Sequence, residues 1–270
     1  DPFGVLFSFG IFAIIAGLYY RTPIPVQPMK AIGGAAIAAG GAVSPAMVWG
    51  AGLFTGVAWT ALGLTGTMSV VKRLAGKPVI RGIVLGVGLS FMAEGLRTFR
   101  PDPWVALAGF ALTLALLRNA RIPAVFALLI FGAAVSLLRD PGLAARLAAV
   151  RPGFRAPVFA LANASWDEIA RGALILGLAQ VPLTLGNAVI AITAENNRLF
   201  PERPVTETKM ALSTGVMNLL SPVFGGIPMC HGAGGMAGHV RFGARTGGAL
   251  VILGGIALVL ALFFSDSMGL

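Results

Sequence analysis

Long apolar runs recur along the whole of this chain and constrain its fold more than any other feature. Runs of 17 or more mostly uncharged residues follow one another from end to end, and each can cross a hydrocarbon layer of about 30 Å. Only 11% of the 270 residues are charged, whereas a soluble fold needs roughly a quarter to cover its surface. The chain is therefore predicted to be an all-α polytopic membrane protein.

The apolar runs predict about ten membrane crossings. Two of the apolar stretches, 24–40 and 227–240, are interrupted by proline and polar residues and are expected to be discontinuous half-helices. The continuous spans are expected at 3–20, 43–64, 79–97, 104–117, 122–138, 169–194, 206–224 and 247–264. A longer basic connection separates the two halves of the chain.

The net charge of +10 does not indicate nucleic-acid binding, because most basic residues lie in the short connections between spans. Cys230 is the single cysteine, so an internal disulfide is excluded and no zinc-type cluster is expected. We therefore predict no cofactor and no metal. We expect an integral protein of a bacterial inner (plasma) membrane, with lipid as its surroundings.

The first interrupted stretch has the features of a helix that starts inside the membrane. Proline lacks an amide donor and favours extended chain before it, so Pro25 and Pro28 predict extended backbone to Gln27 and a helix from about Pro28. The first amides of such a helix have no partners within it, and the helix dipole adds about half a positive charge. This end is therefore expected to bind an anion.

The second interrupted stretch repeats this design. Pro228 ends its extended part, and 230–233 lie at the start of a glycine-rich helix. Seven crossings separate the starts of the two stretches, so the second unit enters from the opposite side. The chain is thus predicted to be an inverted-repeat transporter. A further span precedes the second unit and none precedes the first, so we expect a fold that is incomplete at both ends.

Lys30 lies where an unpaired charge is costly, and a transported anion would be its partner. Alternatively, Lys30 extends to the membrane surface or pairs with an acid. Gln180, Thr184 and Asn187 share one helical face and would contact either the ligand or another helix.

His231 and its neighbour Cys230 could serve a ligand, the packing of the protein or a reaction. His231 would donate a hydrogen bond to an anion or pack, and Cys230 is expected mainly to pack. No orienting carboxylate accompanies these two residues, so an enzyme is disfavoured.

Three motifs resemble the signature segments of the molybdate transporter family, a branch related to the sulfate permeases. They are "PVQPMKAI" at 25–32, "QVPLTLGNAVIA" at 180–191 and "GGIPMCHGAGGMAGHVRFGARTGG" at 225–248, and the loop at 195–220 is also similar. The resemblance implies a uracil-permease-like fold of fourteen crossings, in which a core domain faces a gate domain. Residues 1–75 would form the first core repeat without its first helix, 76–140 the gate helices, 141–168 a basic connecting loop and 169–270 the second core repeat.

The resemblance and the pattern together predict a secondary transporter of molybdate that works by alternating access. A tetrahedral dianion would lie between the two half-helix starts, and a homodimer and a coupled proton are further candidate partners. The predicted substrate-binding residues are Gln27, Pro28, Met29, Lys30, Thr184, Asn187, Cys230, His231, Gly232 and Ala233. A permease for sulfate or another oxyanion, a passive anion channel and a membrane enzyme using Cys230 and His231 remain alternatives.

Overall fold

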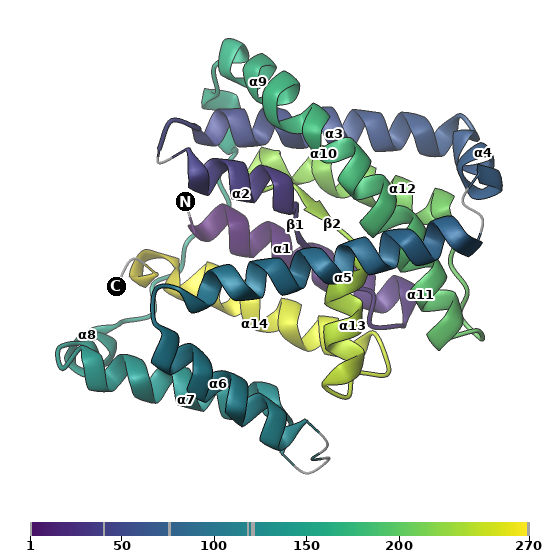
Figure 1. Ribbon diagram of the computed structural model, residues 1–270. Helices are drawn as coiled ribbons and strands as arrows, with labels where there is room; N and C mark the ends of the chain where they lie inside the picture. The colour runs from purple at the N-terminus through teal and green to yellow at the C-terminus, as the bar shows by residue number, and fades with distance from the viewer. Residues whose placement is uncertain (1, 40, 75–76, 118, 120–121, 269–270) are drawn as a thin grey trace.

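The computed structural model of the chain describes residues 2–39, 41–74, 77–117, 119 and 122–268, and it is almost entirely helical (Figure 1). The first half contains α1 (Pro2–Tyr20), β1 (Gln27–Pro28), α2 (Lys30–Ala38), α3 (Pro45–Leu64), α4 (Thr67–Leu74), α5 (Lys77–Phe99), α6 (Pro103–Leu116) and α7 (Ala124–Arg139). The second half contains α8 (Leu143–Ala149), α9 (Trp166–Gly172), α10 (Leu178–Thr184), α11 (Ile192–Leu199), α12 (Glu207–Leu220), β2 (Met229–Cys230), α13 (Ala233–Arg241) and α14 (Gly248–Phe264).

Each of the ten predicted apolar stretches contains a helix, so the all-α fold class is confirmed. Among the described residues, four helical segments are long and apolar enough to cross a membrane. They are Pro2–Tyr20, Pro45–Leu64, Trp166–Leu199 and Gly248–Ser267. The two interrupted stretches form half-helices of 9 residues each, which at about 1.5 Å per residue reach only part of the way across.

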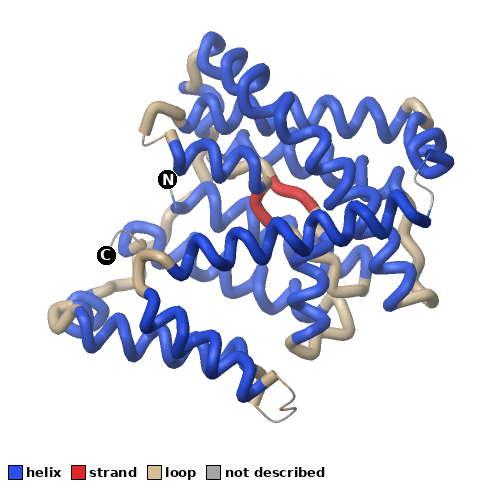
Figure 2. The backbone as a smooth tube through the Cα atoms, in the orientation of Figure 1, coloured by secondary structure: helices blue, strands red, loops and turns tan. Residues whose placement is uncertain are grey.

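The two repeats exchange their packing partners. The first helix of one repeat, α1, packs along the last helix of the other, α14, and α3 packs along α12 in the same way. Glycines allow the α1–α14 approach, since a Cβ at Gly247 would lie 1.9 Å from the carbonyl oxygen of Gly17. In the middle of the fold, β1 and β2 pair antiparallel, as Figure 2 shows in red. The opposite directions of the two strands agree with an inverted repeat.

The long span before α12 is one continuous helical rod with two π-helical segments. These segments, η2 (Ala173–Gly177) and η3 (Leu185–Ala191), lie on either side of α10, which contains Pro182. Proline cannot donate to the carbonyl four residues before it, and π segments accommodate such gaps and are frequent at functional sites. The rod packs against α3.

The segment between the repeats contains α5, α6 and α7. α5 crosses in front of the β ribbon in Figure 1 and packs against η3, while α6 and α7 form a hairpin at the lower left. Asp102 accepts from the Val105 amide at the start of α6 and pairs with Arg139 at the end of α7. The hydrogen bond from Arg139 holds the pKa of Asp102 below its ordinary value.

The segment 141–168, expected as a connecting loop, contains α8, a 3₁₀ turn at Ala160–Asn163 and the start of α9. Its extended part binds the end of α14, where the amides of Gly153 and Arg155 donate to the carbonyls of Phe263 and Leu262. The Ala and Leu residues of "LAARLAA" are strong helix formers, so about two helical turns form where a basic loop was expected.

Candidate anion site

The β ribbon brings the starts of the two half-helices together. Gln27 lies opposite Cys230 and Pro28 opposite Met229, and the Met29 amide adds a bond of 2.9 Å to the Pro228 carbonyl. Because the strands are antiparallel, α2 leaves the ribbon at one end and α13 leaves it at the other. Both helices therefore turn their amide ends toward the same ribbon, which is the arrangement that the interrupted stretches predict.

Asn218 on α12 holds the second strand in place. Its Nδ2 donates to the Met229 carbonyl at 2.9 Å and its Oδ1 accepts from the Met229 amide at 2.7 Å. A two-residue ribbon has few bonds of its own, and isolated hairpins are marginal. The side chain of Asn218 therefore pairs with β2 where a third strand would otherwise do so.

Polar side chains of the helical rod reach the starts of both half-helices. Gln180 Oε1 accepts from the Ala31 amide in the first turn of α2 at 3.0 Å, and Gln180 Nε2 donates to Thr184 Oγ1 at 2.9 Å. Two turns further on, Asn187 lies beside Gly232, the residue before α13. Gln180 belongs to the predicted polar stripe, although it was not among the predicted binding residues.

Gln27 and Asn187 surround Gly232 at the start of α13. A Cβ built at Gly232 would lie 1.8 Å from Gln27 Nε2 and 2.8 Å from Asn187 Nδ2, so only glycine fits here. Gln27 Nε2 and Asn187 Oδ1 are both buried, and neither has a hydrogen-bond partner among the described residues. Because buried polar groups are nearly always paired in proteins, these two carboxamides indicate a place for a polar ligand.

The start of α13 itself is open to such a ligand. The N-cap residue of this helix is Gly232, which has no side chain to cap the helix, and the first helical residues are Ala233 and Gly234. First-turn amides have no partners within a helix and carry the positive end of its dipole. The start of α13, together with the unpaired Gln27 Nε2 donor, can therefore bind an anion.

His231 lies at the ribbon with both ring nitrogens engaged. Its Nδ1 is 2.8 Å from the Pro25 carbonyl and its Nε2 is 2.8 Å from Ser213 Oγ. A carbonyl only accepts, so Nδ1 carries the hydrogen and Nε2 accepts from the serine hydroxyl. The ring is fully buried and packs edge-on against Tyr20. This geometry favours the packing alternative for His231 over direct donation to an anion.

The remaining predicted residues divide between the core and the surface. Met29 and Cys230 are buried in one apolar cluster behind the ribbon, together with Ile32 and Ala188. Pro28 and Lys30 are exposed, and the Lys30 ammonium interacts electrostatically with the Cys230 thiol. The lysine is therefore beside the ribbon and at the surface of the described fold.

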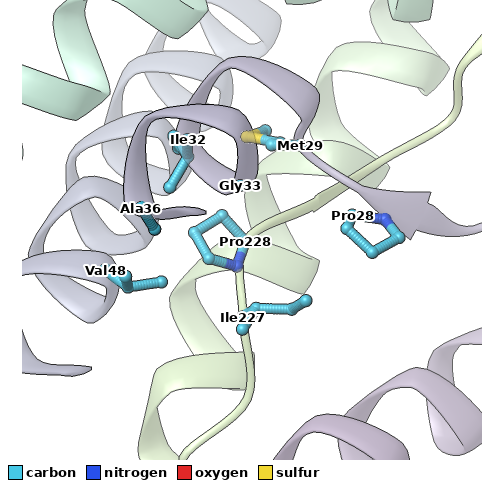
Figure 3. Close-up of a pocket in the computed structure, with 8 residues that line it drawn as sticks. All are labelled: Pro28, Met29, Ile32, Gly33, Ala36, Val48, Ile227 and Pro228. Carbon is cyan, nitrogen blue, oxygen red and sulfur yellow. The ribbon is translucent and has the colours of Figure 1, made fainter. Parts of the chain in front are cut away.

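An apolar cavity lies next to the ribbon and does not suit a dianion. Its volume is about 100 Å³, and Figure 3 shows Met29, Ile32, Val48 and Pro228 among the side chains that line it. Apolar walls cannot compensate a doubly charged group.

Among the described residues, no group of three His, Cys, Asp or Glu side chains could hold a metal ion.

Comparison with known proteins identifies the family. Residues 1–91 and 172–269 match the family described as "Molybdate transporter of MFS superfamily", and these segments contain both half-helices and the polar rod. The chain belongs to this molybdate transporter family. It is 31% identical to "Molybdate transporter 2" of Arabidopsis thaliana and 28% identical to "Molybdate transporter 1" of that plant, in each case over 96% of this chain.

The chain matches only part of the length of its relatives in the molybdate transporter family. The chain spans 65% and 66% of the two plant proteins. These relatives are named as transporters, which agrees with the prediction of a non-enzymatic function. The chain is an integral membrane protein, while the expected bacterial inner membrane gains no support from plant relatives.

A solved structure supports the fold of this member of the molybdate transporter family. The transmembrane domain of the cyanobacterium bicarbonate transporter BicA matches with a TM-score of 0.61 and 16% identity, covering 96% of this chain and 76% of that domain. This likeness confirms the predicted inverted-repeat transporter fold.

Proposed function

We propose that this protein transports molybdate, bound as a tetrahedral dianion at the β ribbon, by alternating access of the site to the two sides of the membrane. The observation that carries the proposal is the buried Gln27 Nε2, a donor with no hydrogen-bond acceptor among the described residues, beside Gly232 at the start of α13. Membership of the molybdate transporter family and the names of the plant relatives support the choice of substrate.

In this proposal the anion lies at the β ribbon between the start of α13 and the start of α2. The amides of Ala233 and Gly234 and the Gln27 Nε2 donate hydrogen bonds, and the α13 dipole contributes about half a positive charge. Asn187 donates through its Nδ2, which lies 2.8 Å from the position that a Cβ would take at Gly232. The Lys30 ammonium supplies a full charge from the neighbouring end of the ribbon. Together these groups compensate most of a charge of minus two.

His231 and Thr184 act indirectly in this proposal. The His231 ring links Pro25 before β1 to Ser213 on α12, and Thr184 binds Gln180. Met29 and Cys230 pack behind the strands. The backbone of the ribbon therefore positions the anion, while the side chains of these four residues keep the ribbon in place.

Movement would involve α5, which crosses the ribbon and packs on the rod at η3 (Figure 1). A displacement of the core, formed by both repeats, against α5, α6 and α7 would expose the ribbon on one side of the membrane and then on the other. Helix dipoles and a lysine recognise the charge and shape that molybdate and sulfate share. The choice of molybdate therefore rests on the family.

The direct test is uptake of radiolabelled molybdate into proteoliposomes that contain the purified protein. We expect accumulation above the external concentration when a proton gradient is imposed, and competition by unlabelled tungstate or sulfate in excess. Equilibration without accumulation under every imposed gradient would instead identify a passive channel. No uptake and no binding of any oxyanion would refute the proposal.

A further inference from the structure

The amide of Gln180 is buried in the middle of the helical rod, with 1% of the residue exposed. Both ends of the amide are engaged: Oε1 accepts from the Ala31 N–H at 3.0 Å, and Nε2 donates to Thr184 Oγ1 at 2.9 Å. The Ala31 N–H can only donate, so the orientation of the amide follows from its partners.

Ala31 is the second residue of α2. Its N–H is one of the first-turn amides that a half-helix offers to an anion, since no carbonyl within the helix can accept from it. In this structure the carbonyl oxygen of Gln180 takes that hydrogen bond. The starts of α2 and α13 therefore differ: a buried side chain binds the first, while the second begins at a glycine that cannot cap it.

We propose that Gln180 Oε1 occupies the position that an oxygen of the bound oxyanion would take at the start of α2. Substrate binding would then displace Oε1 from the Ala31 N–H. This inference rests on the proposed function. When the anion arrives, one of its oxygens accepts from Ala31, while the Nε2 end of Gln180 remains on Thr184. Gln180 is thus a positioning residue that sets affinity, because each binding event must break one internal hydrogen bond.

The hydrogen bond from Ala31 to Gln180 satisfies an amide that an empty half-helix site would otherwise leave unpaired. A first-turn amide left unpaired in an apolar interior is costly, and a neutral carbonyl oxygen satisfies it until a charged acceptor arrives. Hydrogen bonds to a charged acceptor are roughly twice as strong as those to a neutral one. The exchange therefore favours the anion without leaving α2 unsatisfied in its absence.

The test compares molybdate dissociation constants of Gln180 variants by isothermal titration of the purified protein. Gln180→Ala removes the competing oxygen, and we expect binding to tighten roughly 3- to 10-fold, the scale of one net hydrogen bond. Gln180→Glu places a permanent carboxylate at the same amide, and we expect binding to weaken at least about 10-fold, since the negative charge is already supplied.

Tighter binding in Gln180→Ala and weaker binding in Gln180→Glu distinguish displacement from a structural role. A structural role would weaken binding in both variants. If Gln180→Ala does not fold, Gln180→Asn retains the amide but is one methylene shorter, and it should also tighten binding. Thr193→Val is the matched control on the same rod, since Thr193 is buried and its hydroxyl has no partner within the described chain. Its dissociation constant should equal that of the wild type.

Three outcomes would overturn the inference. Weaker binding in Gln180→Ala, an unchanged constant in that variant, or tighter binding in Gln180→Glu would each show that the carbonyl does not compete with substrate. These results leave the proposed function intact as long as the wild type binds molybdate. A wild-type protein that binds no oxyanion would remove the proposed function first and this inference with it.

Discussion

Gln27 and Cys230 lie opposite each other in an antiparallel ribbon, although one comes from the first repeat and the other from the second. This pairing places the amide end of α2 at one end of the ribbon and that of α13 at the other. The side chain of Gln27 then reaches along the ribbon to Gly232, where its Nε2 is buried without a partner in the described structure. The ribbon thus connects the folding of the two repeats with the proposed binding of substrate.

Gly232→Ala should abolish or strongly reduce molybdate binding. A Cβ at this position would lie 1.8 Å from Gln27 Nε2, so Gln27 or the ribbon must move out of place. Gly238→Ala on the same helix is the control, because no described atom beyond its chain neighbours and the backbone of its own helix lies within 4 Å of its Cβ position. Titration calorimetry on both proteins measures the difference. Equal affinity in the two variants would contradict the proposed position of the anion.

Asn218→Ala should destabilise the protein by about 2–4 kcal/mol, because both polar backbone atoms of Met229 lose their partner in a buried place. Thermal unfolding in detergent, followed by circular dichroism, measures the change. Thr214→Val is a suitable comparison, since Thr214 lies one turn away and its buried hydroxyl has no partner among the described residues. A similar loss of unfolding free energy in both variants would show that the two hydrogen bonds from Asn218 to Met229 do not stabilise the protein.

Lys30→Met should weaken molybdate binding by at least about 10-fold, the effect of removing one close charge from a dianion. Lys30→Arg keeps the charge and should retain most of the affinity. Lys209→Met removes a lysine that is also exposed but lies at the start of α12, and it should leave the affinity unchanged. The molybdate dissociation constants of the three variants measure these effects. Unchanged affinity in Lys30→Met would exclude this lysine from the site.

His231 and Ser213 should be energetically coupled, because the serine hydroxyl is bonded to Nε2 of the fully buried ring. A double-mutant cycle with His231→Ala and Ser213→Ala should give a coupling of about 1 kcal/mol in unfolding free energy. Denaturant unfolding of the four proteins supplies the values. Additive effects of the two substitutions would mean that the contact does not stabilise the ribbon.

The helices were predictable because their signals are local. Each of the ten predicted apolar stretches contains a helix, and the expected spans 3–20 and 247–264 correspond to α1 at Pro2–Tyr20 and α14 at Gly248–Phe264. α8 was missed because seven residues are too short for an apolar period to be distinguished from a loop. The π segments were missed as well, since no sequence pattern marks them.

The candidate site was predictable in part. Gln27, Asn187 and Gly232 were identified from proline position, helical spacing and the matched interruptions, and the structure brings these three together. The roles of His231 and Gln180 depend on partners elsewhere in the chain, at Ser213, Pro25 and Ala31. No spacing rule connects those positions, so the sequence could present only alternatives for them.

The sequence by itself determined that this chain is a helical membrane protein with two half-helices in an inverted repeat. Hydrophobic length and proline act on the backbone within a few residues, so their effect does not depend on the rest of the fold. The tertiary structure alone decided which helix start is occupied by a side chain and which is open. Hydrogen-bond partners in a membrane interior are chosen by proximity across helices, and that proximity exists only after the two repeats have packed together.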